Sequence, residues 1–101
     1  MAHFAKIDKD NVVVQVVAVS NCAIGSCIGK DHWDYQEEYH AEHTGNTQFP
    51  ESESLGQKVL ADSGFEGTWL QTSYSASFRG QFACVGMLYD SVKDEFVLPT
   101  A

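Results

Sequence analysis

VVVQVVAV, residues 12–19, is the stretch that decides the fold of this 101-residue chain. Six of its eight residues are valine. A side chain branched at the β-carbon loses rotamer freedom in a helix but packs well on a pleated surface. The run is apolar except for Gln15, which favours a strand buried on both faces. We therefore expect a strand over these residues.

A second strand is expected immediately before this one, from His3 to Asp8. Between the two strands lies Lys9-Asp10-Asn11. Asp and Asn hydrogen-bond their own backbone and tolerate left-handed angles, so this tripeptide is typical of a turn. The N-terminal residues are therefore predicted to form a β-hairpin.

The C-terminal third repeats the pattern of strand, polar turn and strand. Side chains would face alternate sides of a strand from Thr68 to Tyr74, and again from Gln81 to Asp90. Ser91-Val92-Lys93 then forms a turn before a closing strand from Asp94 to Leu98. A second hairpin is thus expected at the C-terminal end.

One helix is expected, from Glu51 to Gly64. Ser52 or Ser54 can serve as its N-cap, and Gly64 as its C-terminal cap. The apolar residues share one face: Leu55, Val59 and Leu60. A helix of about 11 residues is not stable alone, so it should lie on the valine-rich sheet.

These elements predict an α+β fold: an antiparallel sheet of four to five strands, with one helix packed across one face. The length is that of one domain, which we place at residues 1–101. Residues 20–50 show no clean period, and they form an irregular insert rich in acidic and aromatic residues. Loops of this length are usually functional or ordered by a partner.

The net charge of −8 constrains the partners. Binding to nucleic acid or to an anionic membrane needs clustered Lys and Arg, so neither partner is expected. The longest apolar run is too short to span a bilayer, and no signal peptide is recognised at Met1 to Lys6. We expect a protein of the cytosol, or one carried in a particle assembled there, with its three cysteines kept as thiols.

The insert contains candidate ligands for a metal ion. They are Cys22, Cys27, His32, His40 and His43. Their spacings differ from the tight pairs that zinc usually takes, so histidines on a solvated acidic loop are the preferred interpretation. No metal or cofactor is therefore predicted.

No catalytic residues are predicted either. Cys84 lies between apolar residues of an expected strand, where burial would keep its thiol inert. The acidic pairs Glu37–Glu38 and Asp90–Asp94 adjoin expected turns, where carboxylates are ordinarily solvated. We therefore expect a protein that is not an enzyme.

Aromatic residues on the insert suggest protein–protein contacts instead. Trp33, Tyr35 and Tyr39 lie where the domain's own core is less able to cover them. For Trp69, Phe82 and Tyr89, core packing is the preferred interpretation.

The segment from Trp69 to Arg79, WLQTSYSASFR, resembles a W-x-Q-T-S-Y-N-x-x-x-R signature. That signature belongs to a largely uncharacterised family of small proteins from phages of marine cyanobacteria and other aquatic bacteria. Three further segments are similar to the family: residues 2–13, 51–56 and 82–97. Ser75 replaces the usual Asn, and a tail common in the family is missing after Ala101.

The resemblance implies a non-enzymatic bacteriophage structural protein of the virion, assembled in the host cytoplasm. A capsid decoration or cement subunit is expected, bound to the major capsid protein or another virion protein as a homo-oligomer or symmetric array. The alternatives are a tail or fibre adaptor and an intracellular protein that binds a host factor. Arg79 is predicted to form a structural or interface ion pair. The predicted interface comprises Trp33, Tyr35, Tyr39, Trp69, Tyr74, Phe78 and Arg79.

Overall fold

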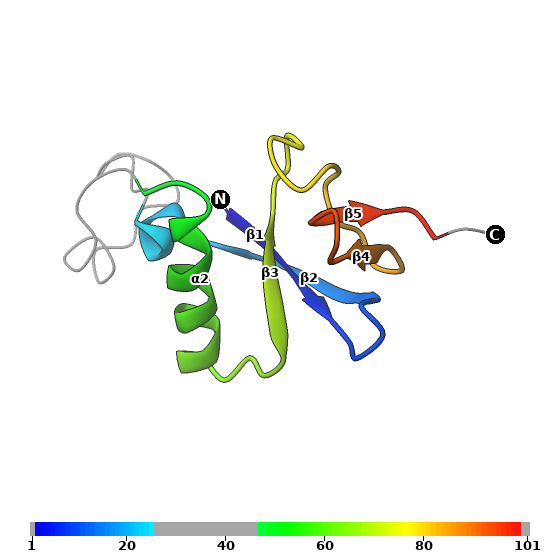
Figure 1. Ribbon diagram of the computed structural model, residues 1–101. Helices are drawn as coiled ribbons and strands as arrows, with labels where there is room; N and C mark the ends of the chain where they lie inside the picture. The colour runs from blue at the N-terminus through cyan, green and yellow to red at the C-terminus, as the bar shows by residue number, and fades with distance from the viewer. Residues whose placement is uncertain (1, 26–46, 100–101) are drawn as a thin grey trace. The chain divides into compact units, whose positions relative to one another are not determined.

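The computed structural model describes residues 2–25 and 47–99 (Figure 1). The chain divides into two compact units. One unit comprises residues 3–17 and 67–101 and holds most of the strands. The other comprises residues 1–2 and 18–66 and holds the helical elements.

Most of a three-stranded sheet, in the order β2-β1-β3, belongs to the first unit. Its strands are β1 (Ala2–Ile7), β2 (Val13–Val19) and β3 (Thr68–Thr72). Strand β1 is central, and it pairs antiparallel with β3 so that His3 lies opposite Thr72. The predicted opening hairpin and the predicted third strand are both confirmed.

The turn between β1 and β2 is built by the side chain of Asp8. Its Oδ1 atom accepts hydrogen bonds from the backbone N–H of Asp10 at 2.8 Å and of Val12 at 3.0 Å. Asn11 takes a left-handed conformation with φ of 62°. The predicted turn forms, with Asn11 in the expected left-handed conformation, but the side chain that bonds its backbone is Asp8, which the prediction placed in the strand.

A second, two-stranded sheet consists of β4 (Leu88–Asp90) and β5 (Glu95–Val97), paired antiparallel. Asp90 organises the turn between them, since its Oδ1 accepts from the N–H groups of Val92 and Lys93. Asp94 closes the turn with φ of 54°. The predicted closing hairpin is confirmed.

The prediction of one sheet with four to five strands is wrong. Strand β4 is short because the chain turns just before it, where the Met87 N–H donates to the Cys84 carbonyl and Gly86 has φ of 96°. A single antiparallel bridge from Val12 to Leu88 links the two sheets. The chain is α+β with antiparallel sheets, but its described strands divide into three and two.

Both sheets contribute to one core within this unit. The fully buried members of the core are Ala5, Val13, Ala83, Met87 and Phe96. Around them pack Ile7, Val16, Leu70 and Tyr89. Of the valine run, Val13 is buried whereas Val14 is exposed, so the expected burial of β2 on both faces is not found.

The second unit contains a short 3-10 helix, η1 (Asn21–Ile24), in contact with the helix α2 (Glu51–Asp62). The helix buries Ser52, Gly56 and Leu60. Its existence and position confirm the prediction. Its packing across the sheet stays a prediction.

The two ends of α2 differ in how well the sequence predicted them. At the start, Pro50 is the N-cap and supplies no side-chain hydrogen bond, so the predicted serine cap is wrong. At the other end, the Gly64 N–H donates to Ala61 and the Phe65 N–H to the Leu60 carbonyl, with Gly64 at φ of 89°. This is a Schellman motif, and it confirms Gly64 as the C-terminal cap.

Candidate functional site: an exposed aromatic cluster beside a fixed loop

The loop after β3 is held by the hydroxyl groups of alternate serines. The Ser73 Oγ accepts from the Ser77 N–H at 3.0 Å, and the Ser73 carbonyl accepts from the Ala76 N–H. The Ser75 hydroxyl lies 2.7 Å from that of Ser77. Ala76 has φ of 57°, which the loop's hydrogen bonds maintain against its steric cost. The loop that carries Tyr74 is therefore fixed by its own backbone and hydroxyls.

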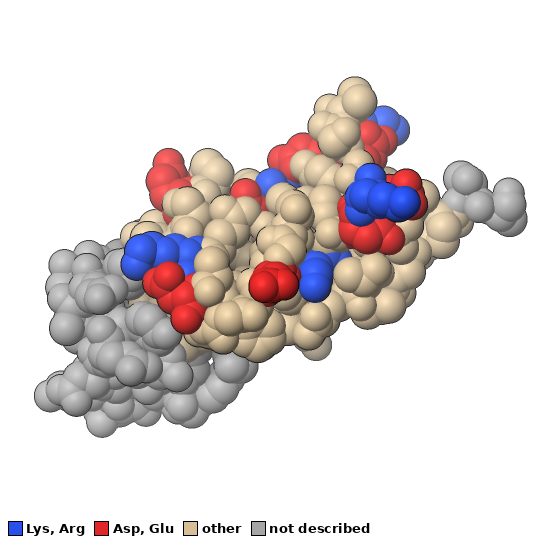
Figure 2. Space-filling model, turned by 90° about the horizontal axis from the view of Figure 1, so that it is seen from below, with Lys and Arg blue, Asp and Glu red and all other residues tan. Residues whose placement is uncertain are grey.

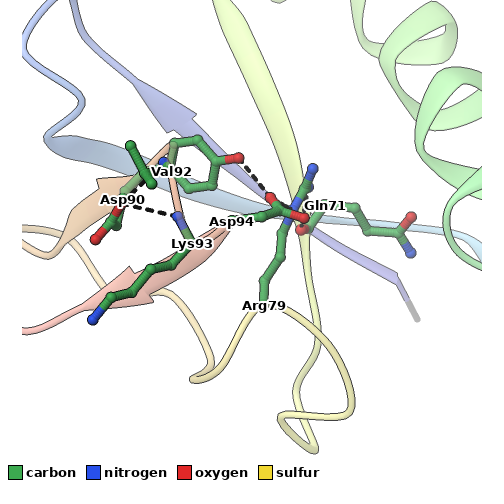
Figure 3. A network of polar contacts seen from close by, with 7 residues as sticks. Gln71, Arg79, Asp90, Val92, Lys93 and Asp94 are labelled. Carbon is green, nitrogen blue, oxygen red and sulfur yellow. Dashed lines mark hydrogen bonds and ion pairs between the residues drawn. The ribbon is translucent and has the colours of Figure 1, made fainter.

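Arg79 anchors the other end of this loop (Figure 3). Its Nε donates to Oδ1 of Asp94 at 2.8 Å, and its Nη1 donates to the backbone carbonyl of Gln71 on β3 at 3.0 Å. Only 8% of the Arg79 side chain is exposed. Its own carbonyl accepts from the N–H of Phe96 on β5. Arg79 forms the predicted ion pair, and it ties the three-stranded sheet to the two-stranded one.

Asp94 receives a second hydrogen bond, from the hydroxyl of Tyr89 at 2.5 Å. The Arg79 guanidinium also lies 5.8 Å from the centroid of the Tyr89 ring. The Tyr89 hydrogen bond, with the hydrogen bond and charge of Arg79, holds the pKa of the Asp94 carboxyl below its ordinary value, although partial burial acts in the opposite direction. Tyr89 and Arg79 together stabilise the ionised carboxylate of Asp94.

Three aromatic rings meet beside this loop. The ring of His3 stacks on Tyr74 with centroids 5.7 Å apart, and Phe82 lies 5.3 Å from each of them in edge-on geometry. Tyr74 nevertheless remains 76% exposed. Burial and the positive charge of the chain's amino group lower the pKa of His3, so the imidazole is neutral over a wider range of pH. We call His3, Tyr74 and Phe82 the aromatic cluster.

The aromatic cluster has the properties of an interaction anchor. Tyrosine offers a large, stiff and amphipathic surface, and aromatic residues are enriched where proteins meet. Two ring contacts already restrict Tyr74, so little side-chain entropy is lost when a partner covers it. The arrangement can bind an apolar or aromatic group of another protein at low entropic cost.

The predicted interface residues are found in different settings. Tyr74 is exposed, Phe78 is half-buried, and Trp69 is buried with 4% of its surface accessible. The remaining aromatic members, Trp33, Tyr35 and Tyr39, lie outside the described residues. Of the predicted interface residues, Tyr74, Phe78 and Arg79 lie on the loop after β3.

Two members of the aromatic cluster were absent from the predicted interface. His3 lies opposite Thr72 in the pairing of β1 with β3, which places it beside the loop that carries Tyr74. Phe82 is fixed nearby because the next residue, Ala83, donates its N–H to the Thr72 hydroxyl at 2.9 Å. Both positions depend on strand register, for which no local signal exists in the sequence.

The cysteines differ from expectation. Cys22 is disulfide-bonded, so the expectation of free thiols is wrong there, and Cys22 cannot act as a thiolate ligand for zinc. Cys84 is a free thiol but exposed, contrary to its predicted burial. The other candidate ligands, Cys27, His32, His40 and His43, lie outside the described residues. Within residues 2–25 and 47–99, no group of three or more metal-ligating side chains converges.

The described surface carries charges of both signs. Figure 2 shows acidic and basic side chains interspersed over one face, separated by uncharged residues. None of the helices in the described part of the chain is both long and apolar enough to cross a membrane.

Comparison with known proteins does not extend this description, because no protein-family model, no curated protein and no solved structure matches the chain.

Proposed function

We propose that the protein is a non-enzymatic structural component of a bacteriophage virion, a capsid decoration or cement subunit that binds its neighbours through protein–protein contacts. The observation that carries the proposal is the exposure of Tyr74 on a loop fixed by Arg79 and by hydroxyl groups. A surface held in one conformation before binding suits a subunit that must dock identically many times. The resemblance of the segment from Trp69 to Arg79 to phage proteins supports a bacteriophage virion as the particle to which the protein belongs.

The disulfide at Cys22 favours a particle over the cell interior. Disulfides persist in oxidising surroundings and are rare in a reducing cytosol. A virion released from its host is exposed to oxidising conditions, whereas a protein that acts only on an intracellular host factor is not. This observation supports a virion component over the intracellular alternative.

The charge of −8 is compatible with the same proposal. A subunit on the outside of a capsid should not compete for the packaged genome, and an acidic surface repels phosphate. Acidic subunits also resist unspecific association in solution. Specific docking then depends on uncharged surfaces such as the aromatic cluster.

Quantitative mass spectrometry of purified virions tests the proposal. A copy number comparable with that of the major capsid protein is the expected result. A low copy number with the protein confined to tails by labelling would instead identify a tail or fibre adaptor. Absence from particles would exclude both structural roles.

A binding assay tests the surface. Particles that lack the protein should take up the purified protein, and Tyr74→Ala should weaken that uptake by about tenfold or more, because an aromatic anchor is lost. The matched control is Val92→Ala, at a position that is 94% exposed on the turn of the other hairpin. Equal uptake of both variants would exclude the aromatic cluster as the contact.

A further inference from the structure

We propose that docking through the aromatic cluster is regulated by pH, with His3 as the switch: a neutral His3 allows a partner to cover the cluster, and a protonated His3 opposes it. The inference rests on the proposed function, in which Tyr74 is the docking anchor. The three rings belong to the same compact unit, so their contacts are internal to it. The aromatic cluster therefore contains a titratable ring among the groups that a partner would cover.

The burial of the three rings places His3 where docking would affect it. His3 and Phe82 are half-buried, whereas Tyr74 is 76% exposed. The imidazole stacks on the Tyr74 ring at a centroid distance of 5.7 Å and meets the Phe82 ring edge-on at 5.3 Å. A partner that covers Tyr74 and Phe82 therefore also removes water from the imidazole that contacts both.

The backbone holds the three rings in this arrangement. His3 lies in β1, opposite Thr72 of β3. The loop that carries Tyr74 is fixed by its serine hydroxyls, and the Thr72 hydroxyl accepts the N–H of Ala83, the residue after Phe82. A positive charge on His3 would therefore arise within the surface that the three rings form, because the backbone keeps the imidazole beside its neighbours.

The segments around His3 supply no carboxylate to pair with a protonated imidazole. As described, β2, β3 and residues 80–87 contain no charged residue. Strand β1 contributes Lys6, and the loop after β3 contributes Arg79, both cations. The other titratable groups on these segments are the Tyr74 hydroxyl and the Cys84 thiol. Burial and the chain's amino group lower the pKa of His3, and no carboxylate acts in the opposite direction.

Desolvation sets the direction of the switch. Full burial of an imidazole lowers its pKa by up to several units, because the cation loses its hydration. Contact of a cation with an aromatic face at an exposed site favours the charged form by less than about one pKa unit. Covering the aromatic cluster should therefore lower the pKa of His3 further. A protonated His3 must then release its proton before the partner docks, so a fall in pH weakens docking.

Uptake of the purified protein by particles that lack it, measured at about pH 7.5 and about pH 5.0, tests the inference. The dissociation constant should be severalfold larger at the lower pH, with a ceiling of about thirtyfold for one group that titrates below 6.5. His3→Gln cannot take up a proton and should lose this dependence. His3→Lys keeps a positive charge and should bind weakly at both pH values.

A matched control separates the position of the imidazole from its presence. Val92→His places an imidazole on the turn of the other hairpin, at a position that is 94% exposed. This variant should show the same dependence on pH as the unaltered protein. Thermal unfolding of each variant at both pH values verifies that the protein in the uptake assay is folded.

An NMR titration of the free chain tests the ring contacts without the particle. Tyr74→Ala removes the ring that stacks on His3, so the pKa of His3 should rise toward its ordinary value of 6.5. Val92→Ala, far along the sequence on an exposed turn, should leave the titration of His3 unchanged. A titration that Tyr74→Ala does not shift overturns the inference.

The uptake assay distinguishes failure of this inference from failure of the proposed function. Equal uptake at both pH values, with Tyr74→Ala still weakening it, overturns the regulation by pH and leaves the proposed docking surface in place. Stronger uptake in acid also overturns the regulation, because it would identify a carboxylate of the partner that pairs with His3. Absence of uptake at both pH values overturns both.

Discussion

The guanidinium of Arg79 donates to the carboxylate of Asp94 across fifteen residues of sequence, with Nε and Oδ1 2.8 Å apart. This pair joins the end of the loop after β3 to the turn of the closing hairpin. Arg79 and Asp94 both adopt left-handed backbone conformations, with φ of 56° and 54°. The pair therefore connects two turns whose backbones are sterically costly, and it keeps both in place.

Replacing Arg79 should destabilise the protein. Arg79→Ala leaves the Gln71 carbonyl and the Asp94 carboxylate without their donor, which should lower the free energy of unfolding by about 2–3 kcal/mol. Arg79→Lys keeps the charge but cannot reach both acceptors as a fork, so it should cost less. Urea denaturation provides the measurement.

The matched control is Lys58→Ala. Lys58 forms an ion pair with Asp62 at 3.3 Å, one turn away on α2, with both side chains about two-thirds exposed or more. Exposed pairs of this kind contribute about 0–0.5 kcal/mol. Equal losses for Arg79→Ala and Lys58→Ala would contradict the assigned role of Arg79.

Acid should remove the contribution of Asp94. The folded pKa lies below the ordinary value of 3.8, so the ionised form stabilises the fold. That stability is present above about pH 3.8 and is lost as the pH falls through the lower, folded pKa. The loss of stability with acid should be shallower for Asp94→Asn than for the unaltered protein, measured by thermal unfolding between about pH 2 and 6. Identical slopes would show that the carboxylate contributes nothing.

Mild acid should act on the aromatic cluster through His3. Its folded pKa lies below 6.5, because burial and the nearby amino group disfavour the cation. The resulting stability is present above about pH 6.5 and is lost as the pH falls toward the folded pKa, because the unfolded chain then binds more protons. The midpoint of thermal unfolding should therefore fall between about pH 7.5 and 5.5. His3→Gln should reduce that dependence. The imidazole NMR signal that disappears in this variant identifies the signal of His3, whose titration can then be followed.

Two glycines should respond differently to alanine. Gly25 and Gly64 both have left-handed backbones, with φ of 79° and 89°. A methyl group at Gly64 would meet no atom within 4 Å, so only the backbone cost of about 1–2 kcal/mol applies. At Gly25 the added carbon would lie 2.7 Å from the Thr47 hydroxyl and 3.2 Å from a Leu55 methyl. Gly25→Ala should therefore destabilise more than Gly64→Ala in the same urea titration, and the reverse order would contradict this packing.

The cysteines should be distinguishable by alkylation. Cys84 is exposed and free, so iodoacetamide should label it in the folded protein. Cys22 is disulfide-bonded and buried, and it should be labelled only after reduction and unfolding. Peptide mapping by mass spectrometry reads both sites, and labelling of Cys22 in the native, unreduced protein would exclude the disulfide.

Part of the candidate site could be predicted from the sequence. Tyr74 and Arg79 were both among the predicted interface residues, and Arg79 forms an ion pair as expected. The contributions of His3 and Phe82 could not be predicted. The rings of His3 and Tyr74 lie some 70 positions apart in the sequence, and their contact depends on the register of β1 against β3. The residues of either strand alone do not specify that register.

The strand predicted from Gln81 to Asp90 shows why alternation alone can mislead. Apolar side chains do alternate there, and Ala83 and Met87 are buried. The intervening chain nevertheless turns at Gly86, because a glycine with positive φ and the hydrogen bond from Met87 to Cys84 satisfy the backbone without a partner strand. Burial and strand pairing are separate requirements, and the sequence pattern reports mainly the first.

The sequence by itself determined the local elements: two hairpins with short polar turns, and a helix capped by Gly64. Their signals lie within a few residues, in side chains that bond nearby backbone groups and in a glycine that adopts a left-handed conformation. Only the tertiary structure decided how the strands divide between sheets, which backbone groups Arg79 bonds on β3 and β5, and which aromatic rings meet. Those outcomes depend on contacts between residues distant in sequence, whose free energy is set by register and packing rather than by any one segment.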